Sequence, residues 1–305
     1  MANSSYPTLW ALVLAGGDGT RLQSLTRLIA GAPIPKQYCR LVGDRSLLEE
    51  TLARLRGLVP ATRTLAVVNR DHLPLASAQL ATLPARNVVV QPRNRDTGPG
   101  ILLPLLALAR RNPDATVAVF PSDHYVANDA GFRGWVRRAA ELVAQHPEKI
   151  VLLGTEPEWA DPGYGYILPG ARVADDAFMV RAFCEKPAAP IAERVVAQGA
   201  LWNCFVMICR VDRLLALVRA RRWRDVECLA AAGDRDALTA TYAQLPPWNF
   251  SHDLLAHVTP HLLLLRATGL GWSDWGTVGA IERTLATLGR TPPWREVAAT
   301  LAATA

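Results

Sequence analysis

Residues 12–22 read Leu12-Val-Leu-Ala-Gly-Gly-Asp-Gly-Thr-Arg-Leu22, and Pro35-Lys36-Gln37 follows a few residues later. A short apolar strand here runs into a loop that contains three glycines. Because glycine has no Cβ and tolerates positive φ, the N–H groups of such a loop approach a ligand closely and surround a phosphate chain. Arg21 and Lys36 supply the positive charge that a polyphosphate requires. The stretch therefore predicts a nucleoside triphosphate site near the amino terminus.

Lysine is rare in this chain, which makes its positions informative. Of the 33 Lys and Arg residues, only Lys36, Lys149 and Lys186 are lysines. An ammonium is a compact point charge and a guanidinium is a planar fork, so the two are not interchangeable at a tight phosphate site. We therefore predict functional roles for Lys36 and for Lys186, which lies in Glu185-Lys186-Pro187. Chance is the alternative, and it is our interpretation of Lys149.

Composition narrows the class of protein. The 305 residues suffice for one large or two modest domains, half of them are hydrophobic, and 20% are charged. The longest apolar run, Ile101 to Ala109, is broken by Pro104 and is too short to cross a bilayer. The amino terminus has no basic segment followed by an apolar signal core. We expect a soluble cytoplasmic protein with no membrane partner.

The cysteines and the charge distribution argue against disulfide-linked, zinc-binding and nucleic-acid-binding proteins. Five cysteines without a C-x-x-C spacing predict neither a disulfide framework nor a zinc site. Cys204 and Cys209 are an odd number of residues apart, so on a strand they would face opposite sides. The net charge of +6 suits anionic ligands, but the arginines are scattered and no nucleic-acid motif accompanies them. Nucleic acid is therefore not an expected partner.

The first half of the chain alternates strand and helix patterns. Ser46 and Glu49 form a capping box ahead of one helix, and Thr97 is expected to cap a leucine-rich helix with a kink at Pro104. Strands that alternate with helices predict an α/β fold, a Rossmann-like mixed and mostly parallel sheet with helices on both faces. Ligands bind such sheets beyond the carboxyl ends of the strands. The predicted strands of this half are Leu9–Leu14, Leu65–Val68, Val88–Val90, Val117–Phe120 and Ile150–Leu153.

The pattern changes from Asp161 onward. Strands are expected over Gly163–Ile167, Phe178–Glu185, Leu201–Cys209 and His261–Arg266, and helices over Ile191–Gln198, Val278–Leu288 and Trp294–Ala302. We see no internal repeat and no Gly/Ser linker. One catalytic domain over residues 1–305 is the simplest organisation.

Several motifs in order carry a resemblance to a known family. The glycine loop and Pro35-Lys-Gln-Tyr38 look like a nucleotide signature, and Gln91–Pro99 is similar to a base-contacting segment. The motifs that follow are Pro121-Ser-Asp-His124, Gly163-Tyr-Gly-Tyr-Ile167, Glu185-Lys-Pro187, Leu201-Trp-Asn203 and Gly271-Trp-Ser-Asp-Trp-Gly276. From Leu12 to about Leu288 the chain resembles the sugar-1-phosphate nucleotidyltransferases, and among them the mannose-1-phosphate guanylyltransferases.

The resemblance implies a GT-A-like, nucleotide-diphospho-sugar transferase fold and a division of labour along the chain. Residues of about 8–155 would bind the nucleotide, about 156–290 the sugar phosphate, and 291–305 would form a C-terminal helix. The implied catalytic residues are Arg21, Lys36 and Lys186. The implied nucleotide-binding residues are Leu14, Ala15, Gly16, Gly17, Gly19, Thr20, Gln91 and Thr97. The implied sugar-phosphate-binding residues are Gly165, Glu185, Lys186 and Asn203.

A magnesium ion is implied on Asp123 and Asp274, bridging the nucleotide and the sugar phosphate. Mg²⁺ prefers oxygen ligands and usually takes one or two carboxylates, which is consistent with that assignment. The alternative is a structural role, in which Asp123 caps a turn and Asp274 caps the helix that begins near Thr277. For Gly165 the alternative is an ordinary bulge in a strand. For His124 we expect packing or an orienting hydrogen bond rather than metal ligation.

The implied reaction joins mannose 1-phosphate to GTP and releases pyrophosphate. The partners are then a nucleoside triphosphate and a sugar 1-phosphate, and oligomeric state is not readable. Other sugars or bases, and a regulatory homologue that binds nucleotide sugar without turnover, stay open as alternatives. A kinase that shares Gly-Gly-Asp-Gly-Thr is a rival class. One departure concerns the sugar pocket: Asn203-Cys-Phe205 replaces the asparagine-serine-glycine type that is more usual in the family.

Overall fold

The fold was analysed in a computed structural model that describes residues 9–295. Its strands are β1 (Leu9–Leu14), β2 (Thr64–Asn69), β3 (Val88–Gln91), β4 (Thr116–Pro121), β5 (Tyr125–Val126), β6 (Ile150–Thr155), β7 (Gly165–Arg172), β8 (Ala177–Glu185), β9 (Leu201–Arg210), β10 (Leu262–Arg266) and β11 (Trp272–Ser273). Its α-helices are α1 (Gln23–Ala30), α2 (Leu47–Leu55), α3 (Leu73–Gln79), α4 (Thr97–Arg111), α5 (Asp129–Gln145), α6 (Ala189–Ala197), α7 (Val211–Ala231), α8 (Arg235–Gln244), α9 (Phe250–Asp253) and α10 (Val278–Thr287).

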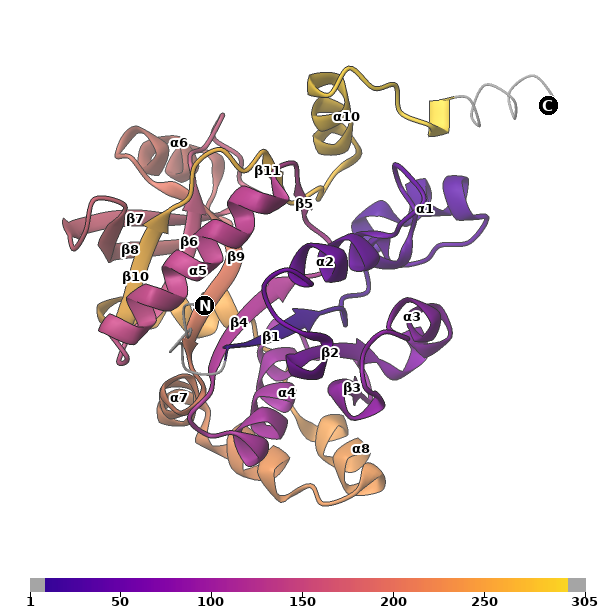
Figure 1. The fold of residues 1–305 in the computed structure, drawn as a ribbon, viewed down its shortest axis with the longest axis vertical. Coiled ribbons are helices and arrows are strands. Elements are labelled where there is room, and N and C mark those ends of the chain that lie inside the picture. Colours follow the sequence, from indigo (N-terminus) through magenta and orange to yellow (C-terminus); the bar gives the residue numbers. More distant parts are fainter. Residues whose placement is uncertain (1–8, 296–305) are drawn as a thin grey trace, which may run out of the picture.

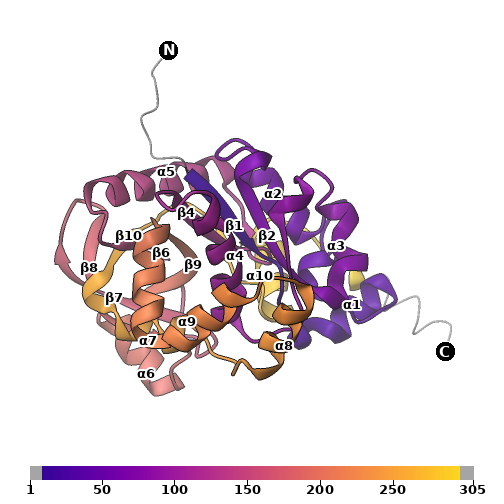
Figure 2. The same cartoon turned by 90° about the horizontal axis from the view of Figure 1, so that it is seen from below.

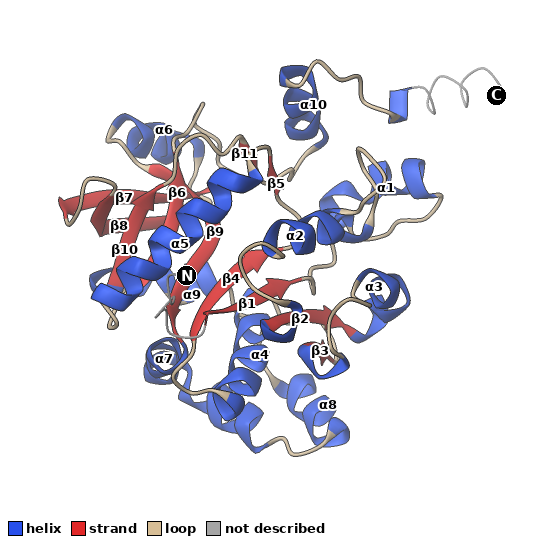
Figure 3. Cartoon of the chain, viewed as in Figure 1, coloured by secondary structure: helices blue, strands red, loops and turns tan. Residues whose placement is uncertain are grey.

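A central sheet runs through the described residues in the order β3-β2-β1-β4-β9-β6-β10-β8-β7 (Figures 1 and 3). The prediction of a mostly parallel sheet is correct for β3, β2, β1 and β4, which all pair in parallel. It is wrong for the other half, where only β6 and β10 pair in parallel. A short turn accounts for the antiparallel pairing of β7 with β8. The antiparallel pairings of β9 with β4 and β6 join strands that are distant in the sequence, so no local pattern predicts them.

The second half of the sheet closes on itself, which the sequence did not predict. Besides β8, strand β7 pairs with the start of β9 through Tyr166↔Trp202 and Ile167↔Leu201. The strands β9, β6, β10, β8 and β7 therefore form a closed ring rather than part of a plain Rossmann-like sheet. Register shifts in β7 on both sides of Pro169 accompany the closure, because bulges bend a strand and increase its twist.

Helices cover both faces of the sheet, as the alternating pattern predicted (Figure 2). Alternate residues of β1 face opposite cores: Ala11 and Val13 belong to the core beneath α2, α3 and α5, and Leu12 to the core beneath α4 and α7. Cys204 and Cys209 of β9 divide between the same two cores, which confirms their predicted opposite orientation.

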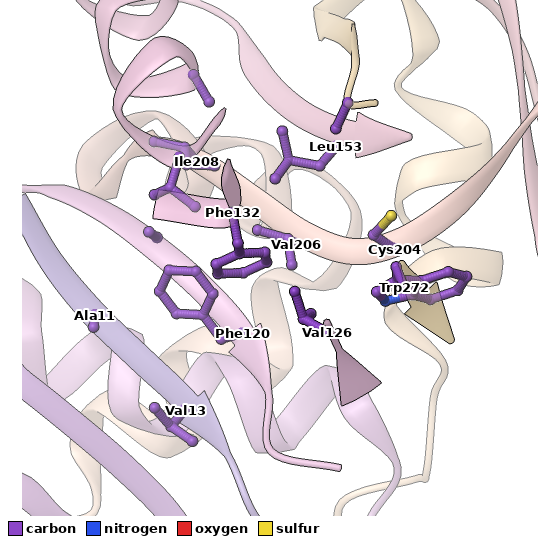
Figure 4. Close-up of a cluster of buried hydrophobic side chains, with 14 of the residues drawn as sticks. Ala11, Val13, Phe120, Val126, Phe132, Leu153, Cys204, Val206, Ile208 and Trp272 are labelled. Atoms are coloured by element: carbon purple, nitrogen blue, oxygen red, sulfur yellow. The ribbon is translucent and has the colours of Figure 1, made fainter. Parts of the chain in front are cut away.

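The first of these cores reaches the region of the motifs. Figure 4 shows Phe120 of β4 beside Phe132 of α5, with Val206 and Trp272 in the same cluster. The two phenylalanine rings have centroids 5.9 Å apart. Trp272 is 8% exposed and also lines the cavity described below, so the core directly supports the wall of that cavity.

The local helix predictions had mixed outcomes. The capping box is confirmed, since Glu49 N–H donates to Ser46 Oγ and Ser46 N–H donates to Glu49 Oε2. The prediction that Thr97 caps α4 is wrong. Asp96 immediately before it is the N-cap and accepts from Thr97 N–H, so Thr97 Oγ1 instead accepts from Phe250 N–H at 2.9 Å. The helix also continues through Pro104.

Two further predictions concern membrane spans and the C-terminal helix. Among residues 9–295, no helix is both long and apolar enough to span a bilayer. The predicted helix Trp294–Ala302 falls, beyond its first two residues, outside the described part of the chain.

Candidate active site

Segments far apart in the sequence meet at one cavity of about 240 Å³. The loop after β1, the loop after β4, the start of β7, the end of β8, the start of β9 and the loop after β11 all contribute to its wall. In Figure 1, β1, β4 and β9 lie side by side in the middle of the sheet that supports it. The predicted site residues that line it are Leu14, Gly17, Arg21, Thr97, Asp123, Gly165, Glu185, Lys186, Asn203 and Asp274.

The glycine loop is held in shape by buried side chains. Gly19 has a φ of +60°, and a Cβ there would lie 2.9 Å from the backbone of Pro35 and Lys36. Gln37 Nε2 donates to the carbonyl oxygens of Ala15 (3.2 Å) and Gly17 (2.7 Å). These bonds anchor the backbone of the loop after β1 to the Gln37 side chain.

Lys36 lies beneath the cavity rather than in its wall. Its side chain is 6% exposed, and Nζ lies 3.3 Å from Asp123 Oδ2. The same Nζ donates to the carbonyl oxygens of Asp274 (2.5 Å) and Trp275 (3.0 Å). An ammonium has three N–H donors, so these partners account for all of them. Lys36 therefore connects the loop after β4 to the loop after β11.

Asp123 is an ionised carboxylate with one face open. Burial acts to raise its pKa, but the Lys36 ammonium and smaller contributions from His124 and Arg21 together outweigh burial, and the net effect holds the pKa below its ordinary value. Its side chain is still 34% exposed and lines the cavity. A carboxylate that stays charged at the carboxyl end of β4 is available to a cationic ligand.

His124 has the orienting role that the sequence predicted. Trp272 Nε1–H donates to its Nδ1 at 3.3 Å, which places the ring proton on Nε2, 3.7 Å from Asp123 Oδ1. Burial lowers the pKa of His124, against the attraction of Asp123. The imidazole is therefore neutral at pH 7 and packs edge-on against the Trp272 ring.

Asp274 is not the helix cap that was considered as its alternative role. Thr277 caps α10, with its Oγ1 accepting from Ala280 N–H. Asp274 Oδ1 instead accepts from Tyr164 O–H (2.9 Å) and Gly276 N–H (2.8 Å). A Cβ on Gly276 would lie 2.5 Å from Asp274 Oδ2 and 3.0 Å from Arg21 Nη1, so the two charged groups are brought close over that glycine.

Glu185 and Lys186 also line the cavity. Lys186 has a φ of +45° and its side chain is 54% exposed, with Nζ 3.5 Å from Glu185 Oε1. Burial raises the pKa of Glu185, against the attraction of Lys186. Gly165 pairs with Glu185 in regular register, so it is not a bulge; a Cβ there would lie 2.6 Å from Glu185 Oε2.

The segment that departs from the family's usual sequence has unusual geometry. Phe205, where glycine is more usual, has a φ of +55°, a conformation that favours glycine. Its N–H donates to Asn203 Oδ1 at 3.0 Å, and both residues line the cavity. The phenyl group therefore occupies space beside the predicted sugar end that a glycine would leave open.

A second cavity of about 380 Å³ adjoins the first and shares Leu14, Gly17 and Thr97 with it. Gln91 and Gly16 line this second cavity. Four predicted site residues are absent from the lining of both cavities: Ala15, Gly19, Thr20 and Lys36. The Ala15 carbonyl is occupied by Gln37 Nε2 and Tyr38 O–H.

Sequence reasoning missed residues that hold the site together. Asn69 Nδ2 donates to Gly16 O at 2.8 Å and to Asp18 Oδ1 at 3.0 Å. Tyr164 bonds to Asp274, and burial raises its pKa, so it is a neutral donor. A signal for Asn69 existed: it is a polar residue at the carboxyl end of a buried strand, at the edge where ligands bind.

The donor set suits a magnesium ion in part. Asp123 and Asp274 both line the first cavity, and Mg²⁺ takes one or two protein carboxylates together with phosphate and water oxygens. Among the described residues, no group of three or more His, Cys, Asp or Glu side chains could hold a metal alone. The two carboxylates fit a metal that arrives with a phosphate, not a closed structural site.

Fold and cavity together define the class of protein: an α/β protein with charged groups gathered at the carboxyl ends of its parallel strands. The chain belongs to the nucleotidyl transferase family, whose model matches residues 10–288. Mannose-1-phosphate guanylyltransferase of Escherichia coli K12 is 34% identical over 223 residues, which are 70% of this chain and 45% of that protein. ManC of Salmonella typhimurium, of the same name, is 36% identical over 217 residues, 68% of this chain and 44% of that protein. The chain thus spans less than half the length of these relatives.

Solved structures agree on the fold. A protein of Thermus thermophilus named mannose-1-phosphate geranyltransferase is 29% identical and superposes with a TM-score of 0.81, covering 92% of this chain and 79% of that one. A UDP-glucose pyrophosphorylase in complex with UDP-glucose is 14% identical, with a TM-score of 0.57 over 92% of this chain and 98% of that one. The second likeness concerns the fold alone.

Proposed function

We propose that this chain transfers a nucleotidyl group from a nucleoside triphosphate to a sugar 1-phosphate. An oxygen of the sugar phosphate attacks the α-phosphorus, the bond to the β-phosphate oxygen breaks, and pyrophosphate leaves with that electron pair. The observation that carries the proposal is the single cavity in which Arg21, Asp123, Lys186 and Asp274 meet, in a chain of the nucleotidyl transferase family.

The chemical problem is repulsion between anions, and two cationic side chains, Arg21 and Lys186, line the cavity. A terminal phosphate carries about 1.5 to 2 negative charges at pH 7, so catalysis consists mostly of positioning and charge neutralisation. Arg21 and the loop amides would bind the triphosphate, and Arg21 would stabilise the departing pyrophosphate. Lys186 would hold the incoming phosphate. Glu185 and Asn203 would bind sugar hydroxyls.

Asp123 and Asp274 would hold Mg²⁺, which supplies a Lewis acid and a template for phosphate oxygens when bound. Lys36 holds both loops through its three contacts. We therefore assign it first the positioning of Asp123. The predicted contact between Lys36 and a phosphate requires that one of these partners be released.

The names of the relatives favour mannose 1-phosphate and GTP as the substrates. Pyrophosphate release tests this directly: purified protein with Mg²⁺ is given GTP, ATP, UTP or dTTP in combination with mannose or glucose 1-phosphate. We expect the highest rate with GTP and mannose 1-phosphate. Release of a nucleoside diphosphate would instead indicate a kinase, and ligand-induced stabilisation without any turnover would indicate a binding homologue.

Asp123→Asn tests the site within the same assay. The amide cannot serve as an anionic ligand, so turnover should fall at least about 100-fold while the circular dichroism spectrum stays unchanged. Asp44→Asn is the matched control, since Asp44 is exposed and lines neither cavity. Equal activity of the two variants would remove Asp123 from the site.

A further inference from the structure

Backbone strain within residues 9–295 gathers around the two cavities. Four residues other than glycine have a positive φ there: Asp96, Lys186, Phe205 and Trp275. Lys186 and Phe205 line the first cavity, Asp96 lines the second, and the Trp275 carbonyl accepts from Lys36. Such conformations cost free energy, and they persist where structure or function requires them. Asp96 caps α4 and Lys186 is expected to bind phosphate, but no such role accounts for Phe205.

The Phe205 ring is held between a hydrophobic core and the first cavity. Its neighbours on β9, Cys204 and Val206, belong to the core beneath α2, α3 and α5, and Phe205 between them faces the opposite side of the sheet. There the half-buried ring packs against the core beneath α4 and α7 and also lines the cavity. Because a packed core does not yield easily, the ring is a rigid part of the cavity wall.

The backbone at Phe205 also orients the Asn203 side chain. Phe205 N–H donates to Asn203 Oδ1 at 3.0 Å, so the NH₂ group is the part of the Asn203 amide that is left for a ligand. A Cβ on Gly165 would lie 2.6 Å from Glu185 Oε2 and 3.4 Å from Asn203 Cβ, so the two polar side chains meet over that glycine. A sugar hydroxyl placed against Gly165 therefore finds an acceptor and a donor together.

The chemistry of a hexose 1-phosphate indicates which of its groups reaches this place. Lys186, which is expected to bind the phosphate on the anomeric carbon, has its Nζ 3.5 Å from Glu185 Oε1. Next to the anomeric carbon are the ring oxygen, which has no hydrogen to donate, and the carbon that bears the 2-hydroxyl. A carboxylate only accepts hydrogen bonds, so Glu185 pairs with the 2-hydroxyl and not with the ring oxygen. Asn203 and Phe205 then lie beside the 2-substituent of the sugar.

We propose that Phe205 limits the size of the sugar, so that this chain accepts a hexose 1-phosphate with a free 2-hydroxyl and rejects one with a 2-acetamido group. The hydroxyl is small and makes the two hydrogen bonds that Glu185 and Asn203 offer. The bulkier acetamido group needs space that the phenyl ring occupies, and a ring fixed in a packed wall does not move to admit it. Phe205 determines specificity and takes no part in the transfer itself. This inference rests on the proposed function, because it assumes that the cavity binds a sugar 1-phosphate.

Pyrophosphate release with mannose 1-phosphate and with its 2-acetamido analogue, N-acetylmannosamine 1-phosphate, tests the size limit. We expect the natural chain to prefer mannose 1-phosphate by about 100-fold or more in kcat/KM. In Phe205→Gly this preference should fall about 10-fold or more, because the space of the ring opens and glycine adopts a positive φ without strain. Calorimetric binding of the two sugar 1-phosphates in the presence of Mg²⁺ gives the same comparison without turnover.

Two further variants separate the bulk of the side chain from other effects. Phe205→Leu keeps most of the bulk at the same positive φ, so most of the preference should remain. Phe178→Ala is the matched control, since Phe178 is also half-buried on a strand, β8, and lines neither cavity. Its preference should equal that of the natural chain. Thermal melting reports whether each variant folds, and if Phe205→Gly does not, Phe205→Asn replaces it, because asparagine is smaller than phenylalanine and tolerates a positive φ.

The outcomes separate the inference from the proposed function. A preference that Phe205→Gly leaves unchanged, in a protein that releases pyrophosphate, overturns the size limit and leaves the transfer reaction standing. Equal use of both sugar 1-phosphates by the natural chain also overturns the size limit, and so does a preference that Phe178→Ala lowers as much as Phe205→Gly does. A difference in binding that depends on Phe205, in a protein that never releases pyrophosphate, supports the size limit and overturns the reaction.

Discussion

Both the sequence and the structure support a phosphate-binding role for Lys186. It is one of three lysines in the chain, it lines the cavity, and its side chain is 54% exposed toward it. In Lys186→Ala we expect the KM for sugar 1-phosphate to rise about 10- to 100-fold, as the loss of a charge-assisted hydrogen bond implies, with the KM for nucleotide changed by less than about threefold. Lys186→Arg should recover only part of this loss, because a planar fork replaces a point charge. Steady-state kinetics that show equal effects on both substrates would contradict the assignment.

Glu185 predicts a pH dependence of stability. Burial raises its pKa in the folded chain, so the folded state binds a proton more tightly than the unfolded state does. Its contribution is therefore most favourable below the unfolded pKa and is lost as the pH rises through the folded pKa. Glu185→Gln removes the buried charge and keeps the shape. Its melting temperature should exceed that of the natural chain by about 2 °C at pH 7 and equal it near pH 3.5.

The opposite change in the stability of Glu185→Gln would contradict this prediction. A variant that is less stable at pH 7 would show that the ion pair with Lys186 outweighs desolvation. The same variant should bind sugar 1-phosphate more weakly, because an amide accepts from hydroxyls less strongly than a carboxylate does. A rise in stability together with a loss of affinity is the pattern expected of a functional residue.

Site residues were predicted correctly where a sequence motif indicates the chemical role of a side chain. They were missed or misassigned where the role depends on contacts with residues distant in the sequence. Asp123 and Lys186 were predicted from the types and order of residues, and both line the cavity. Lys36 was predicted to contact phosphate oxygens. Its ammonium instead contacts three partners from loops nearly 90 or 240 positions away, and no local pattern could reveal them. Asn69 was missed because its role exists only once the glycine loop lies beside β2.

At the scale of elements, α4 depends on one glycine. A Cβ on Gly98 would lie 2.1 Å from the ring of Trp248, which is 2% exposed. We expect Gly98→Ala to destabilise the chain by about 1–3 kcal/mol, since overpacking displaces the ring. Gly134→Ala, in α5, is the matched control: a Cβ there meets nothing within 4 Å, so it should stabilise by about 0.4–1 kcal/mol. Chemical denaturation of both variants checks the pair, and destabilisation by both would mean that helical glycines matter here for a reason other than space.

Helices and strands were predicted correctly where nearby residues in the sequence carry a clear hydrophobic or capping pattern. Strand β1 was predicted at its observed bounds, and the capping box before α2 was predicted with the two residues that form it. The span 211–260 was not divided into helices in advance, although it contains α7, α8 and α9. Helix α7 includes a residue with non-helical angles, Arg222, and its charged residues do not fall on one face, so the periodic signal is weak.

At the scale of the molecule, the order of strands in the sheet determines whether either half of the chain is able to fold alone. The predicted nucleotide half ends near residue 155, yet β9 pairs with both β4 and β6 and so lies between two strands of that half. Without β9 and β10, β6 has no partner strand and β4 has an open edge. No sequence pattern indicated this insertion, because it follows from pairing between residues about 50 to 90 positions apart.

We therefore expect the two halves to fold only together. A protease site inserted in the turn at 156–163, where Glu156, Glu158 and Pro162 are exposed, allows the folded chain to be cut without loss of its sheet. The cut protein should stay associated through the pairings of β9 and β6, and should melt in one transition followed by both far-ultraviolet circular dichroism and tryptophan fluorescence. After separation in denaturant, the fragment 1–155 should show no cooperative transition, because its strands β4 and β6 lack the strand that joins them. Mixing both fragments should restore the transition. A fragment 1–155 that melts cooperatively alone would show that the parallel half is an independent unit, and that the cavity lies between two units instead of within one sheet.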